Sequence, residues 1–206
     1  MTPPTPDGKY DMPLDKNGKP RTDISFGEAH LFLDFIQHHV MAHVETGLFP
    51  HLPLSSSRKA LYGHSYGGIF ALNALFTKPT LFDLFIAASP EISWNNYALV
   101  KNQEAAFHDQ AREHPADPRP SLFITWGTSA DELERQPGES EEAWRSRKSN
   151  AEDKEMRPSA KALVARLEDC PSVRNIWASE FKGEDHGSAA VVALQRGIMK
   201  FLVGAP

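Results

Sequence analysis

The 206-residue chain carries a formal net charge of −5, and 40% of its residues are hydrophobic while 24% are charged. This composition is typical of a globular protein with one sizeable core, and the negative charge argues against nucleic acid or an anionic membrane surface as a partner. No run of eighteen apolar residues and no cationic apolar leader occurs, so we expect neither a membrane span nor a signal peptide. The single cysteine, Cys170, forms no internal disulfide and no zinc site, which favours a cytoplasmic protein without metal or cofactor.

The first quarter of the chain divides into an arm and a helix. Residues 1–22 are rich in proline, glycine and lysine, which predicts an irregular arm. In 26–46, apolar residues at mostly three- and four-residue spacing predict an amphipathic helix with one packed face. The residues of this expected face are Ala29, Leu31, Phe32, Phe35, Ile36, Val40 and Val44.

After this helix, predicted strands and helices alternate. Short apolar runs that end at polar or glycine residues predict strands at 58–62, 81–90, 121–127 and 173–181. Helical patterns occur at 69–76, 97–113, 153–169 and 187–202. This alternation favours an α/β fold whose mainly parallel, doubly wound sheet carries helices on its faces.

We expect the whole chain, 1–206, to form a single domain. Residues 131–157 interrupt the alternation with a dense mixture of both charge signs and almost no apolar face. Such a pattern predicts a solvated insertion rather than a binding surface.

The stretch GHSYG at 63–67 fits G-x-S-x-G, the nucleophile elbow, in which a serine occupies a strained turn between a strand and a helix. An apolar strand precedes this turn and an apolar helix follows it, as the motif requires. Ser65 is therefore the candidate nucleophile. The backbone N–H of Tyr66, near the helix N-terminus, is the candidate donor to a developing oxyanion.

A serine hydroxyl needs a base to become nucleophilic at neutral pH, and the chain offers nine histidines. His186 in GEDHG follows the last predicted strand and precedes the last predicted helix, where an α/β-hydrolase carries its histidine. His64, beside the serine, is expected to pack or to shape the turn rather than to act as base. We therefore assign the base to His186.

The acid that orients the histidine should follow the strand at 121–127, because the chain order is serine, acid, histidine. Asp131 and Glu132 both lie there, and the sequence does not choose between them. Glu184, Asp185 or a serine–histidine pair without a carboxylate remain alternatives.

Three stretches carry a resemblance to a known family: GHSYGGIFALNALF, FDLFIAASPEISWNN and GEDHGSAAVVALQRGIMKFL. They resemble the esterase branch of the α/β-hydrolases that contains the ferric-siderophore esterases of the enterobactin and salmochelin type and their fungal counterparts. The similarity runs from about Arg21 to Leu202. The SP-x-x-x-W-N-N box at 89–96, combined with the E-x-H-G-S end, is much more specific than the elbow.

This resemblance implies a serine ester hydrolase that cleaves a small-molecule siderophore ester, carried as its iron complex, through an acyl-enzyme. It implies that Trp94 and Asn95 lie near the substrate pocket, to which we add His64 beside the nucleophile. Trp94 at the end of a strand is equally compatible with a place in the core.

The chain departs from this family before the elbow. An α/β-hydrolase carries several strands there, whereas the 64 residues before Ser65 contain one convincing helix and no strong strand. We therefore expect a fold that lacks some N-terminal strands, and a homo-oligomer formed through the exposed sheet edge. A catalytically weak homologue that acts by binding, and a hydrolase of other carboxylic esters or thioesters, are the alternative functions.

Overall fold

The computed structural model describes residues 1–13, 18–128, 134–150 and 156–204 of the chain. Its centre is a four-stranded sheet in which every neighbouring pair is parallel. The strands follow one another in sequence order as β1 (Ala60–His64), β2 (Leu84–Ala88), β3 (Ser121–Gly127) and β4 (Ile176–Phe181). The predicted α/β class with a mainly parallel sheet is confirmed.

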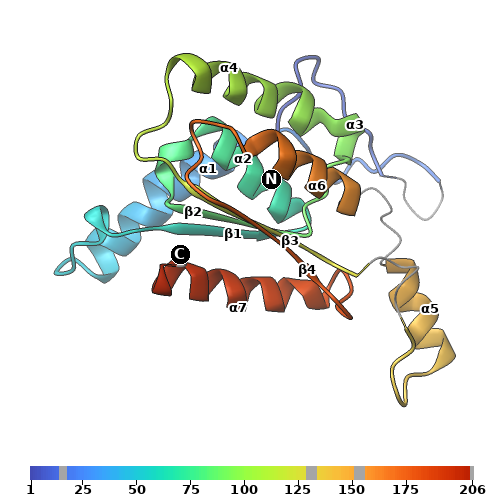
Figure 1. Ribbon diagram of the computed structural model, residues 1–206. Coiled ribbons are helices and arrows are strands. Elements are labelled where there is room, and N and C mark those ends of the chain that lie inside the picture. The colour runs from blue at the N-terminus through green and yellow to red at the C-terminus, as the bar shows by residue number, and fades with distance from the viewer. Residues whose placement is uncertain (14–17, 129–133, 151–155, 205–206) are drawn as a thin grey trace.

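Helices cover both faces of the sheet (Figure 1). α7 (Ser188–Val203) lies on one face, and α2 (Tyr66–Thr77), α4 (Ala105–Glu113) and α6 (Met156–Leu167) lie on the other. The remaining helical segments are α1 (Ala29–Phe35), η1 (Ile36–Met41), η2 (His43–Leu48), η3 (Leu54–Ser56), η4 (Pro79–Leu81), α3 (Trp94–Ala98), η5 (Leu99–Glu104) and α5 (Glu141–Asn150). Within the described residues, none of the helices has both the length and the apolar character needed to cross a membrane. The cytoplasmic location stays a prediction.

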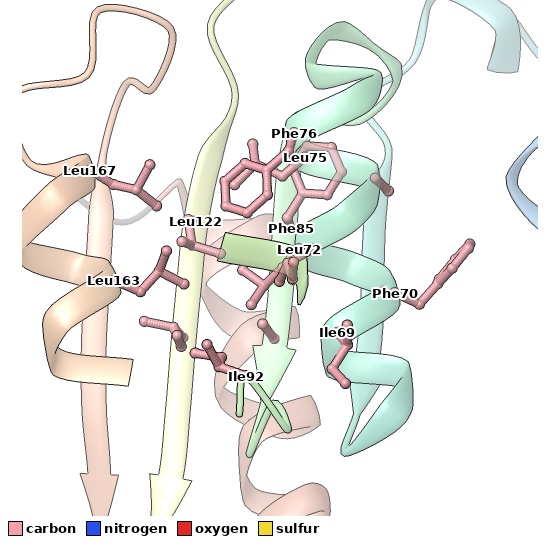
Figure 2. Packing of buried hydrophobic residues seen from close by; sticks show 14 of the residues in the cluster. Ile69, Phe70, Leu72, Leu75, Phe76, Phe85, Ile92, Leu122, Leu163 and Leu167 are labelled. Atoms are coloured by element: carbon pink, nitrogen blue, oxygen red, sulfur yellow. The ribbon is translucent and has the colours of Figure 1, made fainter. Parts of the chain in front are cut away.

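The larger core lies between the sheet and α2 (Figure 2). Every residue of α2 from Gly68 to Phe76 is buried, because this helix is enclosed by the sheet and by other helices. β2 is also buried at all five positions, as expected for a central parallel strand with helices on both faces. The mostly apolar sequence of these two elements suits that burial, with Asn73 the buried polar exception in α2.

The smaller core lies under α7. Small residues face the sheet at Ala189, Ala193 and Gly197, all buried, so the helix axis approaches the strands closely. A Cβ atom at Gly197 would lie 2.6 Å from the side chain of Ile86. The opposite side of α7 is apolar and exposed, at Val191, Leu194, Ile198, Met199, Leu202 and Val203.

The helical segment at 29–48 is present as predicted, but its packed face is different. Ala29 and Leu33 are buried, whereas Leu31, Phe35 and Val40 are 41–56% exposed. The sequence pattern was wrong here because an apolar stripe is buried only where a neighbouring element covers it. Phe32 does contact the ring of Phe70 on α2, 5.1 Å away between ring centres.

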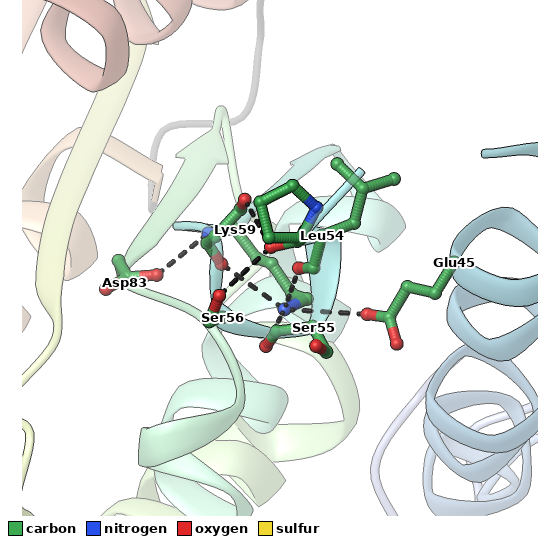
Figure 3. A network of polar contacts seen from close by, with 8 residues as sticks. Glu45, Leu54, Ser55, Ser56, Lys59 and Asp83 are labelled. Atoms are coloured by element: carbon green, nitrogen blue, oxygen red, sulfur yellow. Dashed lines mark hydrogen bonds and ion pairs between the residues drawn. The ribbon is translucent and has the colours of Figure 1, made fainter. Parts of the chain in front are cut away.

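β1 is an edge strand of the sheet. It pairs with β2, and no other strand of the described residues lies on its second side or precedes it in this sheet. Lys59 holds the segment that leads into β1. Its Nζ donates to the carbonyls of Leu54 and Ser55 at 3.0 Å, as Figure 3 shows. The Lys59 N–H donates to the Asp83 side chain at 2.8 Å and so links the residues that directly precede β1 and β2.

An ion pair connects α6 to the segment before α4. The Glu104 carboxylate is 2% exposed and accepts two hydrogen bonds from the Arg166 guanidinium, at 2.5 and 2.9 Å. These bonds raise the pKa of Arg166 above its usual value.

Arg166→Ala should destabilise the fold by about 3 kcal/mol, because it leaves the buried Glu104 charge without its main partner. Arg112→Ala is the matched control, since Arg112 pairs with Asp109 while both side chains are about three-quarters exposed. The control should change stability by less than about 1 kcal/mol. Urea unfolding of both variants measures the difference, and equal midpoints would contradict the structural role of the pair.

Candidate functional site

Ser65 stands in a strained turn between β1 and α2. Its backbone has φ 58° and ψ −118°, a conformation that non-glycine residues rarely adopt. The Ser65 N–H donates to the carbonyl of Ala88 at 3.0 Å, which ties the turn to the carboxyl end of β2. The geometry agrees with the elbow expected from the sequence.

The amide of Tyr66 lies in the first turn of α2. The first hydrogen bond of this helix runs from the Ile69 N–H to the Ser65 carbonyl at 3.1 Å, so the Tyr66 N–H has no acceptor inside the helix. The Tyr66 side chain is 42% exposed, and partial burial raises the pKa of its hydroxyl, with a smaller effect of the Glu91 charge. An anion beside Ser65 would meet a helix N-terminus here.

Two glycines of the elbow are required by close contacts. A Cβ atom on Gly63 would lie 1.8 Å from the carbonyl oxygen of Gly67, and one on Gly68 would lie 2.9 Å from Cα of Pro90. By contrast, a Cβ atom on Gly67 would meet no atom within 4 Å. The strand and helix therefore cross at Gly63, while the second glycine of the G-x-S-x-G pattern is sterically dispensable.

His186 lies on the loop between β4 and α7, which is attached to the end of β3. The Thr128 N–H donates to the Glu184 carbonyl at 2.7 Å, and the Gly183 N–H donates to Oγ1 of Thr128 at 2.6 Å. Gly127 lets this loop approach, because a Cβ atom there would lie 2.5 Å from the Glu184 carbonyl oxygen. The loop is thus fixed at the same strand end as the elbow.

His64, the last residue of β1, joins this loop to the elbow. Its Nε2 lies 2.7 Å from the carbonyl oxygen of His186, and the two imidazole centres are 4.6 Å apart. Both rings are half-buried. Because Ser65 directly follows His64, the fold brings the predicted nucleophile and the predicted base to one end of the sheet.

The predicted acids, Asp131 and Glu132, lie outside the described residues. Of the alternatives, Asp185 is used locally, since its Oδ1 accepts the Ser188 N–H at 2.8 Å and its own N–H donates to the Ser188 hydroxyl at 2.9 Å. This reciprocal pair begins α7. The described residues contain no group of three or more His, Cys, Asp and Glu side chains arranged for a metal ion.

Trp94 belongs to an aromatic cluster beside the elbow. Its ring is 8% exposed and lies against Tyr10 and Phe26, with centres 5.9 and 5.4 Å apart, and Phe26 in turn contacts Tyr66 at 6.4 Å. Sequence reasoning missed Tyr10 and Phe26, because nothing in the irregular arm indicates which helix it contacts. The alternative for Trp94, a place in the core, agrees with its burial.

Asn95 and the residues after it form a left-handed turn. Asn95, Asn96 and Tyr97 have φ values of 50°, 54° and 61°, and asparagine tolerates this region better than other non-glycine residues. The Asn95 amide accepts the Asp11 N–H at 2.8 Å and donates to the Lys9 carbonyl at 3.2 Å. The W-N-N box therefore anchors the N-terminal arm, in addition to any contact with substrate.

A cavity of about 820 Å³ lies between the arm and this turn. Lys9, Tyr10, Asn95 and Lys101 are among its lining residues, and it is open to solvent. The elbow and His186 do not line it. Tyr10 connects the cavity to the site, because it lines the cavity and also contacts Trp94 and Phe26.

The chain is similar to a known protein family and to named relatives. A family model described as "Putative esterase" matches residues 5–166. A protein of Aspergillus fumigatus, named siderophore triacetylfusarinine C esterase, is 37% identical over 89% of this chain and 61% of its own length. A protein of Emericella nidulans, named siderophore enterobactin esterase, is 37% identical over 97% of this chain and 63% of its own length.

Solved structures show the same fold. Siderophore hydrolase EstA from Aspergillus nidulans superposes with a TM-score of 0.81 at 36% identity, covering 100% of this chain and 65% of that one. The chain therefore spans less than two thirds of the length of these relatives.

Gly63→Ala should open the elbow, because the new methyl group meets the backbone of Gly67, which cannot move without displacing α2. We expect a loss of about 3 kcal/mol or more in the free energy of unfolding. Gly67→Ala is the control, and it should be neutral or up to about 1 kcal/mol more stable, as alanine favours a helix over glycine. Denaturant unfolding decides, and a Gly63→Ala variant as stable as the control would contradict the crossing at Gly63.

Proposed function

Because this chain belongs to the esterase family, we propose that it is a serine ester hydrolase of the α/β-hydrolase type that acts on siderophore esters. One observation carries the proposal. The strained turn at Ser65 and the loop of His186 meet at the same end of a parallel sheet, joined by the contact of 2.7 Å from His64.

In the proposed reaction, Ser65 Oγ attacks the ester carbonyl while His186 accepts the hydroxyl proton. The carbonyl oxygen becomes an oxyanion to which the Tyr66 N–H donates. The C–O bond to the alcohol then breaks, and His186 returns the proton to the leaving alkoxide. Water, deprotonated by His186, attacks the acyl-enzyme, the bond to Ser65 Oγ breaks, and His186 returns the proton to Ser65 as the acid is released.

The third member of the triad is proposed from the residues after β3. Either Asp131 or Glu132 would accept the second N–H of His186 and stabilise its cation during the reaction. Since α/β-hydrolases carry the acid in this part of the chain, the position supports either residue.

The substrate class is proposed from the relatives, whose names specify triacetylfusarinine C and enterobactin. Tyr66, which follows Ser65, contacts Phe26, and Phe26 contacts Tyr10. Such a row of aromatic rings suits a planar group of the substrate. Trp94, Asn95 and His64 are the other substrate-binding candidates. Iron would enter as part of the substrate, so no cofactor is proposed.

A second candidate is a catalytically weak homologue that acts by binding. The open edge of β1 in the described part of the chain favours it. The Tyr66 N–H is the one oxyanion donor that we propose. Lack of a second donor would lower kcat, since loss of one such donor costs an esterase about 10²- to 10³-fold. Hydrolysis of other carboxylic esters or thioesters uses the same residues.

Ser65→Ala should remove ester turnover and also abolish labelling by a fluorophosphonate probe, read out as an added mass on the intact protein. Triacetylfusarinine C, enterobactin and p-nitrophenyl acetate, with and without iron for the two siderophores, distinguish the substrate classes. His186→Ala should be labelled at least about 10³-fold more slowly. An unlabelled wild-type protein that binds a siderophore without cleaving it would favour the weak homologue.

We also propose that the chain self-associates through the β1 edge and the neighbouring apolar side of α7. Val191, Ile198 and Leu202 lie on one stripe of this helix, with 44–72% of each side chain exposed. A second copy would pair the open strand and cover this stripe at the same time.

The double variant Val191→Glu and Ile198→Glu should shift the protein to monomer in light scattering, because burying two carboxylates at an apolar contact is unfavourable. Arg112→Glu, on the helix α4 of the other face, is the control and should leave the mass unchanged. A wild-type monomer that binds no hydrophobic dye would contradict the association.

A further inference from the structure

Two side chains of β1 hold the beginning of α7. Tyr62 and His64 are two residues apart, so they project from the same face of the strand. The Tyr62 hydroxyl donates to the carbonyl of Ala190 at 2.8 Å, and Nε2 of His64 lies 2.7 Å from the carbonyl oxygen of His186. The two acceptors are four residues apart, at the junction of the loop and the helix.

The chemistry of the acceptor fixes the proton on His64. A carbonyl oxygen can only accept, so Nε2 of His64 carries hydrogen and donates to it. The length of 2.7 Å is at the short end for an N–H···O bond. The Nε2–H of His64 therefore donates to the backbone of His186, the residue whose side chain is the proposed base.

Other contacts hold the loop at residues before and after His186. Thr128 attaches Gly183 and Glu184 to the end of β3, and the reciprocal bonds of Asp185 and Ser188 start the helix. The bond from His64 is made to His186 itself. It comes from the residue that precedes Ser65 in a strand whose register on β2 is fixed, with His64 opposite Ala88.

We infer that His64 is a positioning residue that sets the distance between Ser65 and His186 through its hydrogen bond to the His186 backbone. This inference rests on the proposed esterase function. The Nε2 donor of His64 bonds to the loop, although His64 occupies the variable position of the elbow, where a contact with substrate is also proposed. A displacement of the base by about 1 Å is enough to lower kcat by about 10²-fold.

Three variants separate the hydrogen bond from packing. His64→Phe keeps a ring against His186 and removes the donor, while His64→Gln places an amide N–H near the position of Nε2 and removes the ring. Tyr62→Phe is the matched control, because it deletes a bond of similar length from the same strand face to α7 without touching His186.

We expect His64→Phe to lower kcat and the rate of fluorophosphonate labelling by about 10²-fold with an unchanged KM, and His64→Gln to recover to within about tenfold of wild type. Tyr62→Phe should lower kcat less than about threefold. Thermal unfolding is measured for all three variants. If His64 acted through packing alone, His64→Phe and Tyr62→Phe would change thermal stability and kcat to a similar extent. If His64→Phe fails to fold, His64→Asn serves as the donor-deleting variant, because its amide is too short to reach the carbonyl.

A second readout requires no turnover. In protein labelled with ¹³C at the histidine ε1 carbon, the His186 signal, assigned with His186→Ala, should move or broaden in His64→Phe and stay near its place in His64→Gln. An unmoved signal, or a His64→Phe variant with wild-type kcat, would overturn the positioning role. Those results leave the esterase proposal intact, whereas a Ser65→Ala variant that still hydrolyses esters overturns the proposed function.

Discussion

The close approach of β1 and α2 at Gly63 is the constraint on which the site depends. With the Gly67 carbonyl where a Cβ atom of residue 63 would lie, the helix starts immediately beside the strand end, and Ser65 is forced into its left-handed conformation. The bond from the Ser65 N–H to Ala88 then ties this turn to the centre of the sheet. A flexible turn would allow the Ser65 hydroxyl several positions, whereas this constrained turn allows few. A proposed nucleophile needs such a fixed position to meet a proposed base that another loop carries.

The sheet brings the second partner to the same place. In a parallel sheet all carboxyl ends lie on one edge, so loops from β1, β2, β3 and β4 converge although they are far apart in sequence. Gly127 and Thr128 allow and then fix the approach of the His186 loop, and His64 connects it to β1. The loop of the proposed base is thus held by hydrogen bonds to its backbone, from His64 of β1 and from Thr128 directly after β3, and it continues into α7, which packs on the smaller core.

Much of this was predictable because it depends on local chemistry. Alternating apolar runs gave the four strands, and G-x-S-x-G gave the turn at Ser65, since both patterns reflect contacts of neighbouring residues. The packed face of the helix at 29–48 was not predictable, as the sequence does not contain the position of the covering element. For the same reason Tyr10 and Phe26 were missed, and the left-handed turn at Asn95 could have been suspected only from its paired asparagines. The hydrogen bond from His64 to the His186 carbonyl was not predicted, because adjacency to Ser65 does not reveal where a ring nitrogen finds its acceptor.

The N-terminal arm has a consequence for how the protein is made. Two of its docking bonds join residues 84 and 99 positions apart, from Asp11 to Asn95 and from Pro4 to Gln103. During synthesis on the ribosome, at about 5–20 residues per second, these partners are made several seconds after the arm. In that interval Tyr10 can contact Phe26 but not Trp94. Translation speed before residue 103 thus sets how long the aromatic surface beside the elbow stays open to other chains.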